Sequence, residues 1–352
     1  MTLIRRPAAR MAAAGTLWHT RPRTVFFDTK QELLDHLKAH EPKQPLTQRL
    51  PRFLYRGQTR RHIDRYYPPT RIRSCPIRRY SLVLEDLAPS DYRLLEASLA
   101  TGTSPARLEA RYGNTIAYVR TALTLDAVEQ VVNQLASRRT TNWLAGLRTT
   151  PGRLTEVLSL GQHYGLPTNY LDLTSNWRVA LWFASSDFQT GKPFSGGTYG
   201  VVYRIDRRAL RRSIKSLIQT HGISTRDFRL VSIRNTPPAI GRRARAQHGW
   251  SLVGSESLAL LDDLIARNGV WAYTFPHPSA HPRDIARLTP SILTRNEPIQ
   301  IEIDRYRTVN HWRNRRAQLN QIGGRLRNAG LQPSQPVNFA DAKWCRYAFG
   351  RP

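Results

Sequence analysis

The amino-acid sequence has few acidic residues and almost no cysteine. Its 352 residues include 54 lysines and arginines against 25 aspartates and glutamates, which gives a formal net charge of +29. The two cysteines, Cys75 and Cys345, are far apart, which argues against a disulfide framework and against a cysteine metal site. We therefore expect a cytoplasmic protein that holds no metal.

Long apolar runs and several well-known enzyme motifs are missing as well. No apolar run approaches the roughly 18 residues that span a bilayer, so we expect no membrane partner. The sequence contains no phosphate-binding P-loop, no Gly-x-Gly-x-x-Gly, no His-Glu-x-x-His and no Gly-x-Ser-x-Gly. These absences argue against the enzyme classes that depend on those motifs.

The positive charge is mostly arginine, and it has two interpretations. Guanidinium groups match phosphate, which favours attraction to polyanions such as nucleic acid. An arginine-rich composition can also reflect genomic base composition alone. One expected helix over residues 207–219 carries a basic stripe that either faces phosphate or is simply solvated: Arg207, Arg208, Arg211, Arg212 and Lys215.

Residues 160–184 combine polar side chains with turn signals and an apolar helical pattern. A helix that begins near Arg153 should end at Gly165. A turn and a short strand follow, with Asp172 on the face opposite its apolar neighbours. Thr174 or Ser175 should then cap a new helix. Its expected buried face consists of Trp177, Ala180, Leu181, Ala184 and Phe188.

The remaining patterns predict an α+β fold with a mixed β-sheet flanked by helices. Strands are expected at residues 25–27, 53–58, 199–205, 251–253 and 299–303. Helices are expected at residues 29–40, 89–100, 105–119, 125–135 and from 309 to about 329. We divide the chain into a basic arm (1–24), a main domain (25–308) with a helical insertion at about 89–150, and a basic C-terminal helix and tail (309–352).

Two candidate residues each allow a structural and a chemical role. His163 has no histidine or cysteine at metal-ligand spacing, which favours a structural histidine. Asp172 is a lone acid among apolar strand residues, so it should be paired with Arg56, Arg178 or Arg243. A structural ion pair and a catalytic one are both compatible with that pattern.

Four separate motifs resemble, in order and spacing, the FRG domain family, over roughly residues 25–330. They are Tyr55-Arg-Gly-Gln58, Gln162-His-Tyr-Gly-Leu-Pro-Thr168, Leu171-Asp-Leu-Thr174 with Val179-Ala-Leu-Trp-Phe-Ala184, and Arg243-x-x-x-Gln247-x-Gly-Trp250. Tyr55 replaces the usual phenylalanine, Leu173 replaces the usual tryptophan, and Trp250 stands where phenylalanine is common. The family occurs mainly in bacteria and phages, sometimes in proteins linked to toxin or anti-phage defence roles.

The same motifs also resemble the core of ADP-ribosyltransferases. That likeness implies that Arg56 and Gly57 bind NAD and that Thr174 and Ser175 form a second motif. Departure of nicotinamide leaves an oxocarbenium-like cation that an acid can stabilise. Asp172, Glu256 and Glu302 are candidates for that acid, while Gln247 stands where a transferase often has glutamate and cannot supply negative charge.

We therefore predict a bacterial effector or anti-phage defence enzyme that binds NAD and transfers ADP-ribose or cleaves NAD. The alternative is a non-catalytic module that binds nucleic acid or a protein. The predicted catalytic residues are Arg56, Asp172, Thr174, Gln247 and Glu302. The predicted ligand-binding residues are Tyr55, Gly57, Gln58, Gln162, His163, Tyr164, Ser175 and Arg243.

Overall fold

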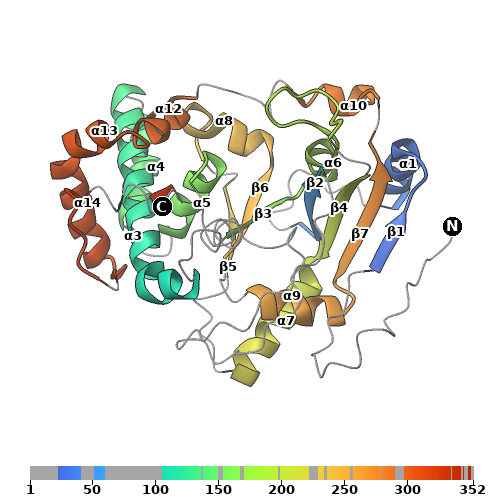
Figure 1. Cartoon of the computed structure of the whole chain (residues 1–352), viewed down its shortest axis with the longest axis horizontal. Coiled ribbons are helices and arrows are strands. Elements are labelled where there is room, and N and C mark those ends of the chain that lie inside the picture. Colours follow the sequence, from blue (N-terminus) through green and yellow to red (C-terminus); the bar gives the residue numbers. More distant parts are fainter. Residues whose placement is uncertain are drawn as a thin grey trace.

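The structure is a computed structural model that places a single mixed β-sheet between layers of helices (Figure 1). It describes residues 23–40, 51–59, 105–135, 138–149, 154–166, 170–196, 199–221, 229–233, 236–253, 257–277, 279–289, 297–333, 335–341, 344 and 348–349. The strands are β1 (Arg23–Phe26), β2 (Phe53–Gln58), β3 (Tyr170–Thr174), β4 (Tyr199–Asp206), β5 (Arg229–Ser232), β6 (Gly249–Val253) and β7 (Val270–Pro276).

The helices lie on both faces of the sheet and beyond one of its edges (Figure 1). They are α1 (Lys30–His40), α3 (Pro105–Leu135), α4 (Arg138–Thr149), α5 (Leu154–His163), α6 (Trp177–Ser185), α7 (Arg207–His221), α8 (Pro238–Ala246), α9 (Ser257–Ala266), α10 (Arg283–Ala286), α12 (Pro298–Arg305), α13 (Val309–Asn314) and α14 (Arg316–Asn328). Within the described part of the chain, no helix combines the length and apolarity needed to cross a bilayer.

The strand order is β1-β7-β4-β2-β3-β6-β5, and the sheet is weakest between β2 and β3. β1 runs parallel to β7, and the other neighbours are antiparallel. β2 pairs with β4 along its whole length, whereas the fully described strands β2 and β3 share one paired position, Tyr55 with Thr174. The sheet therefore consists of a four-strand block and a three-strand block that separate after this position.

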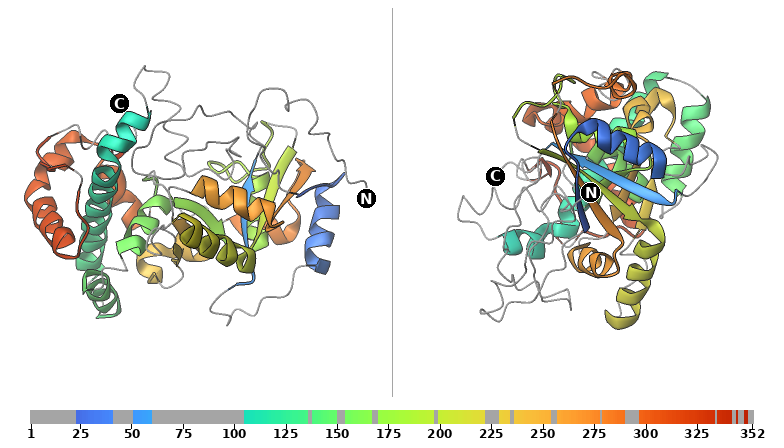
Figure 2. Two further views of the ribbon diagram at one scale, coloured as in Figure 1. Left: turned by 90° about the horizontal axis from the view of Figure 1, so that it is seen from below. Right: turned by 90° about the vertical axis from the view of Figure 1, so that its right-hand side faces the viewer.

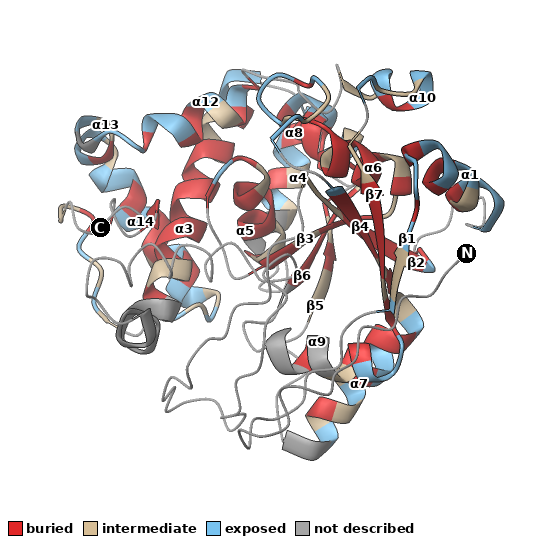
Figure 3. Cartoon of the chain, turned by 45° about the vertical axis from the view of Figure 1, so that its right-hand side comes forward, coloured by how far each residue is buried: buried red, intermediate tan, exposed pale blue. Residues whose placement is uncertain are grey.

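Strand alternation assigns the two faces of the sheet to different helices. Leu54, Leu171 and Trp250 point to one face, where they pack with α7 and α9. Phe53 and Tyr55 point to the other face, where they pack with α1 and α6. Figure 3 shows the central strands as mostly buried between these layers, whereas the edge strands β1 and β5 are more exposed. The predicted mixed sheet flanked by helices is thus confirmed.

Helix α6 lies unusually close to the sheet because glycines lie beneath it. A Cβ atom added to Gly57 on β2 would come within 1.8 Å of the Ala180 carbonyl oxygen. A Cβ atom added to Gly200 on β4 would come within 2.2 Å of the Ala184 carbonyl oxygen. The glycine of the Tyr-Arg-Gly-Gln motif therefore has a packing role, since any side chain there would displace α6.

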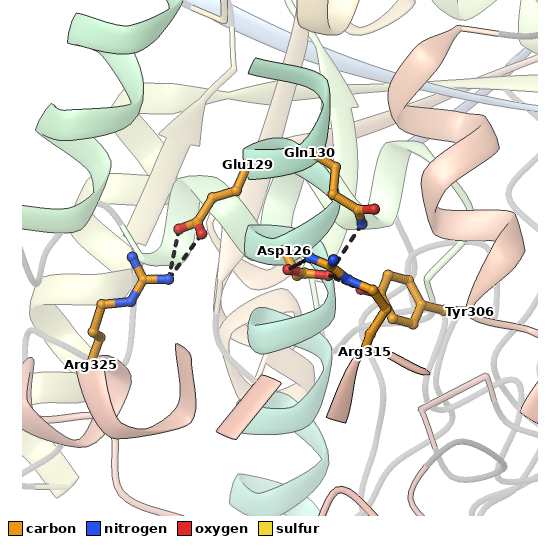
Figure 4. A network of polar contacts seen from close by, with 6 residues as sticks. All are labelled: Asp126, Glu129, Gln130, Tyr306, Arg315 and Arg325. Atoms are coloured by element: carbon orange, nitrogen blue, oxygen red, sulfur yellow. Dashed lines mark hydrogen bonds and ion pairs between the residues drawn. The ribbon is translucent and has the colours of Figure 1, made fainter. Parts of the chain in front are cut away.

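A second core lies beside the three-strand block, where α3 packs against α5, α12 and α14 (Figures 1 and 2). At its centre the Asp126 carboxylate is buried on α3 and accepts hydrogen bonds from three side chains (Figure 4). Arg315 donates to both oxygens at 2.7 and 3.0 Å, Gln130 donates at 3.2 Å, and the Tyr306 hydroxyl donates to Oδ2. One turn along, Arg325 of α14 pairs with Glu129 at 2.8 Å. These contacts fix the C-terminal helices on α3.

Several local predictions are corrected by the structure. Residues 299–303 form part of helix α12 and not a strand, because Glu297 is its N-cap and Pro298 begins its first turn. The patterns at 105–119 and 125–135 belong to one continuous helix, α3. Asn176, and not Thr174 or Ser175, caps α6 by accepting from the Arg178 N–H. The helix ends at Ser185, so Phe188 lies outside it and is 47% exposed. The expected helix at 89–100 falls outside the described residues.

Candidate functional site

The candidate site lies where α5, β3, α8 and β6 meet on one face of the sheet. Helix α5 ends at His163, and Gly165 adopts a φ of 93°, the left-handed conformation expected after a helix C-terminus. Helix α8 ends at Ala246 with Gln247 as its C-cap, and His248 follows with a φ of 49° before β6 begins. The first turn thus places His163 beside Asp172 of β3, and the second places Gln247 beside His163.

His163 and Asp172 form the centre of this cluster. The His163 Nε2 atom lies 3.6 Å from Asp172 Oδ1, and the two side chains are 6% and 42% exposed. On the other side of the ring, Nδ1 lies 3.1 Å from Gln247 Oε1. Because an amide oxygen only accepts, Nδ1 carries the hydrogen, and Nε2 of the neutral ring is an acceptor.

The facing atoms of this pair lack hydrogen-bond partners among the described residues. His163 Nε2 and Asp172 Oδ1 are both buried and unpaired. Burial lowers the pKa of His163, although the neighbouring Asp172 charge opposes the shift, so the neutral ring is favoured. Two acceptors therefore face one another at 3.6 Å, and no donor in the described structure satisfies either of them.

Asp172 is held by its backbone as well as by its neighbours. Arg56 Nη1 donates to the Asp172 carbonyl oxygen at 2.9 Å. With its amide oriented to present oxygen, Gln58 accepts from Arg56 Nε and Nη2 at 2.9 and 2.8 Å. The Arg56 side chain, 8% exposed, thus bridges β2 and β3 where the strands stop pairing.

The predicted residues divide between the two faces of the sheet. Tyr55 pairs with Thr174, so alternation places Thr174 and the Asp172 side chain on the α5 and α6 face. Arg56 pairs with Tyr203, which packs on the α7 and α9 face. Arg56 therefore meets Asp172 through the backbone carbonyl and not through the carboxylate that the sequence suggested.

Thr174 and Gln162 secure the turns around the pair. The Thr174 hydroxyl donates to the Gln247 carbonyl oxygen at 2.7 Å and accepts from the Asn176 N–H at 3.0 Å. Gln162 Nε2 donates to the Tyr170 carbonyl oxygen at 3.0 Å. Ser175 contributes its backbone N–H to the His248 carbonyl oxygen at 3.2 Å. Through these hydrogen bonds to backbone groups, the three residues hold the turns that carry His163 and Gln247 in place next to β3.

Arg243 and Tyr164 belong to a supporting layer behind His163. The Arg243 guanidinium lies 4.6 Å from the centre of the Tyr164 ring and donates to the His163 carbonyl oxygen. Glu297 accepts from the Tyr164 hydroxyl and, at 2.7 Å, from the Arg243 backbone N–H. Burial, followed by the Glu297 charge, raises the pKa of Tyr164, so this phenol stays protonated at neutral pH.

Glu297 and Gln300 are members of this layer that the sequence patterns did not identify. Gln300 Oε1 accepts from Arg243 at 3.0 Å, and its Nε2 donates to the Tyr164 carbonyl oxygen at 3.0 Å. The Glu297-Pro298 pair is a helix-start signal, and it would have placed both residues on one helix.

The other predicted partners and carboxylates lie elsewhere. Arg178 stacks on Trp177 at 4.4 Å. Glu302 is buried on α12, and its Oε1 accepts from Arg305 at 2.7 Å. Glu256 falls outside the described residues. Asp172 is therefore the predicted carboxylate that the described structure places in the cluster. No group of three potential metal-ligating side chains occurs in the described parts of the chain.

One comparison with known proteins is informative. The family model of the FRG domain matches residues 95–192. The match confirms the FRG resemblance over that segment, which contains Gln162, His163, Asp172 and Thr174, whereas the motifs at 55–58 and 243–250 lie outside it. No curated protein and no solved structure is detectably similar to the chain.

Proposed function

Starting from the FRG domain that the chain carries at residues 95–192, we propose that this protein uses NAD as a substrate and either transfers its ADP-ribose or cleaves it. The bond between nicotinamide and ribose C1 breaks, and its electron pair leaves with the nicotinamide nitrogen. The ribose then resembles an oxocarbenium cation, which a fixed negative charge stabilises. The observation that carries the proposal is the Asp172 carboxylate beside the buried His163 ring.

Asp172 suits this role because its two oxygens differ in environment. Oδ1 is buried against His163, whereas the side chain as a whole is 42% exposed. The exposed part supplies negative charge to the ribose ring in the proposed reaction. The attacking water or acceptor hydroxyl forms the new bond to C1, and its proton passes to Nε2 of the neutral His163 ring, so that Asp172 keeps its negative charge.

The separation of β2 from β3 leaves the Asp172 backbone to bond with a side chain in place of a strand. After the Tyr55–Thr174 pair, the Asp172 carbonyl accepts from the Arg56 side chain at 2.9 Å. We assign Arg56 as a positioning residue, since its bond to that carbonyl holds Asp172 at the separation. Gln247 and Thr174 likewise position the turn that carries the His163 contact.

Nicotinamide release from NAD tests the proposal. We expect the wild-type protein to release nicotinamide, with water or an added protein extract as acceptor, and Asp172→Asn to lower the rate by about 100-fold or more. Asp263→Asn is the matched control, because Asp263 is a surface carboxylate on α9 that pairs with Arg267. It should retain the wild-type rate.

Two results would count against the proposal. Wild-type protein that neither binds NAD nor releases nicotinamide with any acceptor would favour the alternative, a non-catalytic module that binds nucleic acid or a protein. Turnover that survives Asp172→Asn, with a thermal midpoint equal to that of the wild type, would remove Asp172 from the reaction.

A further inference from the structure

Helix α7 presents a strongly basic face that the proposed reaction does not use. Its apolar side consists of Ala209, Leu210 and Leu217, which pack against the sheet and α9. Its other side exposes Arg208, Arg211, Arg212 and Lys215. The helix extends past the end of the sheet (Figures 1 and 2).

The charges on this face are not balanced within the described structure. Residues 207–221 contain no aspartate or glutamate. The described residues include no acidic partner for the side chains of Arg208, Arg211, Arg212 or Lys215. Some exposed arginines elsewhere do have an acidic partner: Arg267 pairs with Asp263, Arg305 with Glu302, and Arg307 with Asp304.

The first turn of α7 is electrostatically unfavourable. Arg207 and Arg208 stand at the N-terminal end of the helix, where the backbone dipole favours negative charge. Burial, followed by the charges of Arg211 and Arg208, lowers the pKa of Arg207. Asp206 partly offsets this cost by accepting from the Arg208 and Ala209 N–H groups at 2.7 and 3.1 Å. An external anion along the helix would relieve the repulsion between the arginines.

We propose that the exposed basic face of α7 binds the phosphate backbone of double-stranded nucleic acid. Arg208 and Lys215 are seven residues apart, which corresponds to about 10 Å along a helix. Phosphates on one strand of a duplex follow one another at about 3.4 Å along its axis, so the face matches about three of them. This inference goes beyond the proposed NAD chemistry and does not depend on it.

The composition of α7 distinguishes a duplex from other polyanions. Single strands are usually held by aromatic side chains on which bases stack, and α7 contains no phenylalanine, tyrosine or tryptophan. An amphipathic helix that binds a membrane surface inserts its apolar side into the lipid. The apolar side of α7 is already buried against the sheet, so only its cations are available.

The test compares two triple variants of equal charge. The first is Arg208→Gln/Arg212→Gln/Lys215→Gln on α7. The control is Arg283→Gln/Arg287→Gln/Arg316→Gln, which removes three exposed arginines from α10, its C-terminal end and α14. Binding to a fluorescent 20-base-pair DNA is measured by anisotropy over a series of salt concentrations. Thermal midpoints and nicotinamide release are measured on the same samples.

We expect the α7 variant to bind more weakly and to lose salt dependence. Each lost phosphate contact reduces the slope of log affinity against log salt by about 0.9, so three contacts reduce it by about 2.7. The control should keep most of the wild-type slope. Equal slopes for the two variants, absence of DNA binding by the wild type at low salt, or stronger binding to single strands or to anionic vesicles would each overturn the proposal. Unchanged nicotinamide release in the α7 variant would separate this result from the fate of the NAD proposal.

Discussion

Replacing Asp126 with asparagine tests how the C-terminal helices are held on α3. The substitution keeps the shape of the side chain but removes its charge and replaces one acceptor oxygen with an NH2 group, so one of the two Arg315 donors loses its acceptor. Removing one partner of a buried ion pair costs about 3 to 5 kcal/mol, because the remaining charge is left uncompensated. The Arg315 side chain is 25% exposed and can reach water, so we expect the lower value, about 3 kcal/mol.

The magnitude can be assigned to the pair by a double-mutant cycle. Asp126→Asn, Arg315→Met and the double variant are compared by urea unfolding. We expect the double variant to lose less stability than the sum of the single losses, by at least about 1 kcal/mol, because the residues share one contact. Glu129→Gln is the control: Arg325 is 40% exposed, so its pair with Glu129 should contribute less than about 1 kcal/mol. Additive losses, or equal losses at Asp126 and Glu129, would refute this reasoning.

Two further predictions concern packing and pH. Gly57→Ala should destabilise the protein by at least about 3 kcal/mol in thermal unfolding, because its Cβ would lie 1.8 Å from the Ala180 oxygen. Gly324→Ala is the control, because its Cβ meets nothing closer than 3.9 Å. This helical substitution should be neutral or slightly stabilising. Burial lowers the pKa of Lys30 from 10.5 to about 8, so between these values the unfolded chain holds more protons than the native protein and stability rises with pH. Lowering the pKa by about 2.5 corresponds to a free energy of about 3 kcal/mol, since a pKa difference of one is worth about 1.36 kcal/mol. Between pH 8 and 10.5 the free energy of unfolding of the wild-type protein should therefore rise by about 3 kcal/mol relative to that of Lys30→Met. Below pH 8 the difference between the two proteins should stay constant. A constant difference between these two proteins across denaturation curves in that range would contradict the assignment.

Local sequence patterns were sufficient to predict those helices and strands whose apolar residues follow a single periodicity. The alternation in residues 199–205 predicted β4, and the apolar spacing before Gly165 predicted α5 and its end. The pattern at Ile299, Ile301 and Ile303 failed because positions 299 and 303 are also one helical turn apart. Those two residues are buried on α12, and Ile301 is 40% exposed, as a helix requires.

Long-range pairing was not predictable from these patterns. Gln162, His163, Asp172 and Gln247, which the sequence motifs singled out, lie in one region: Gln162 and His163 are at the end of α5, Asp172 is on β3, and Gln247 caps α8. It could not assign Arg56 to the opposite face of the sheet, since that depends on the single Tyr55–Thr174 pair and on the register it fixes. A shift of one residue would exchange the faces of every side chain on β2.

The short junction between β2 and β3 also has a mechanical consequence. Two blocks of strands joined at one paired position can rotate relative to one another more easily than strands that are hydrogen-bonded along their whole length. Arg56 spans this junction from the four-strand block to the backbone of the other block. Its guanidinium therefore adds a second connection between the two blocks beside the single Tyr55–Thr174 pair.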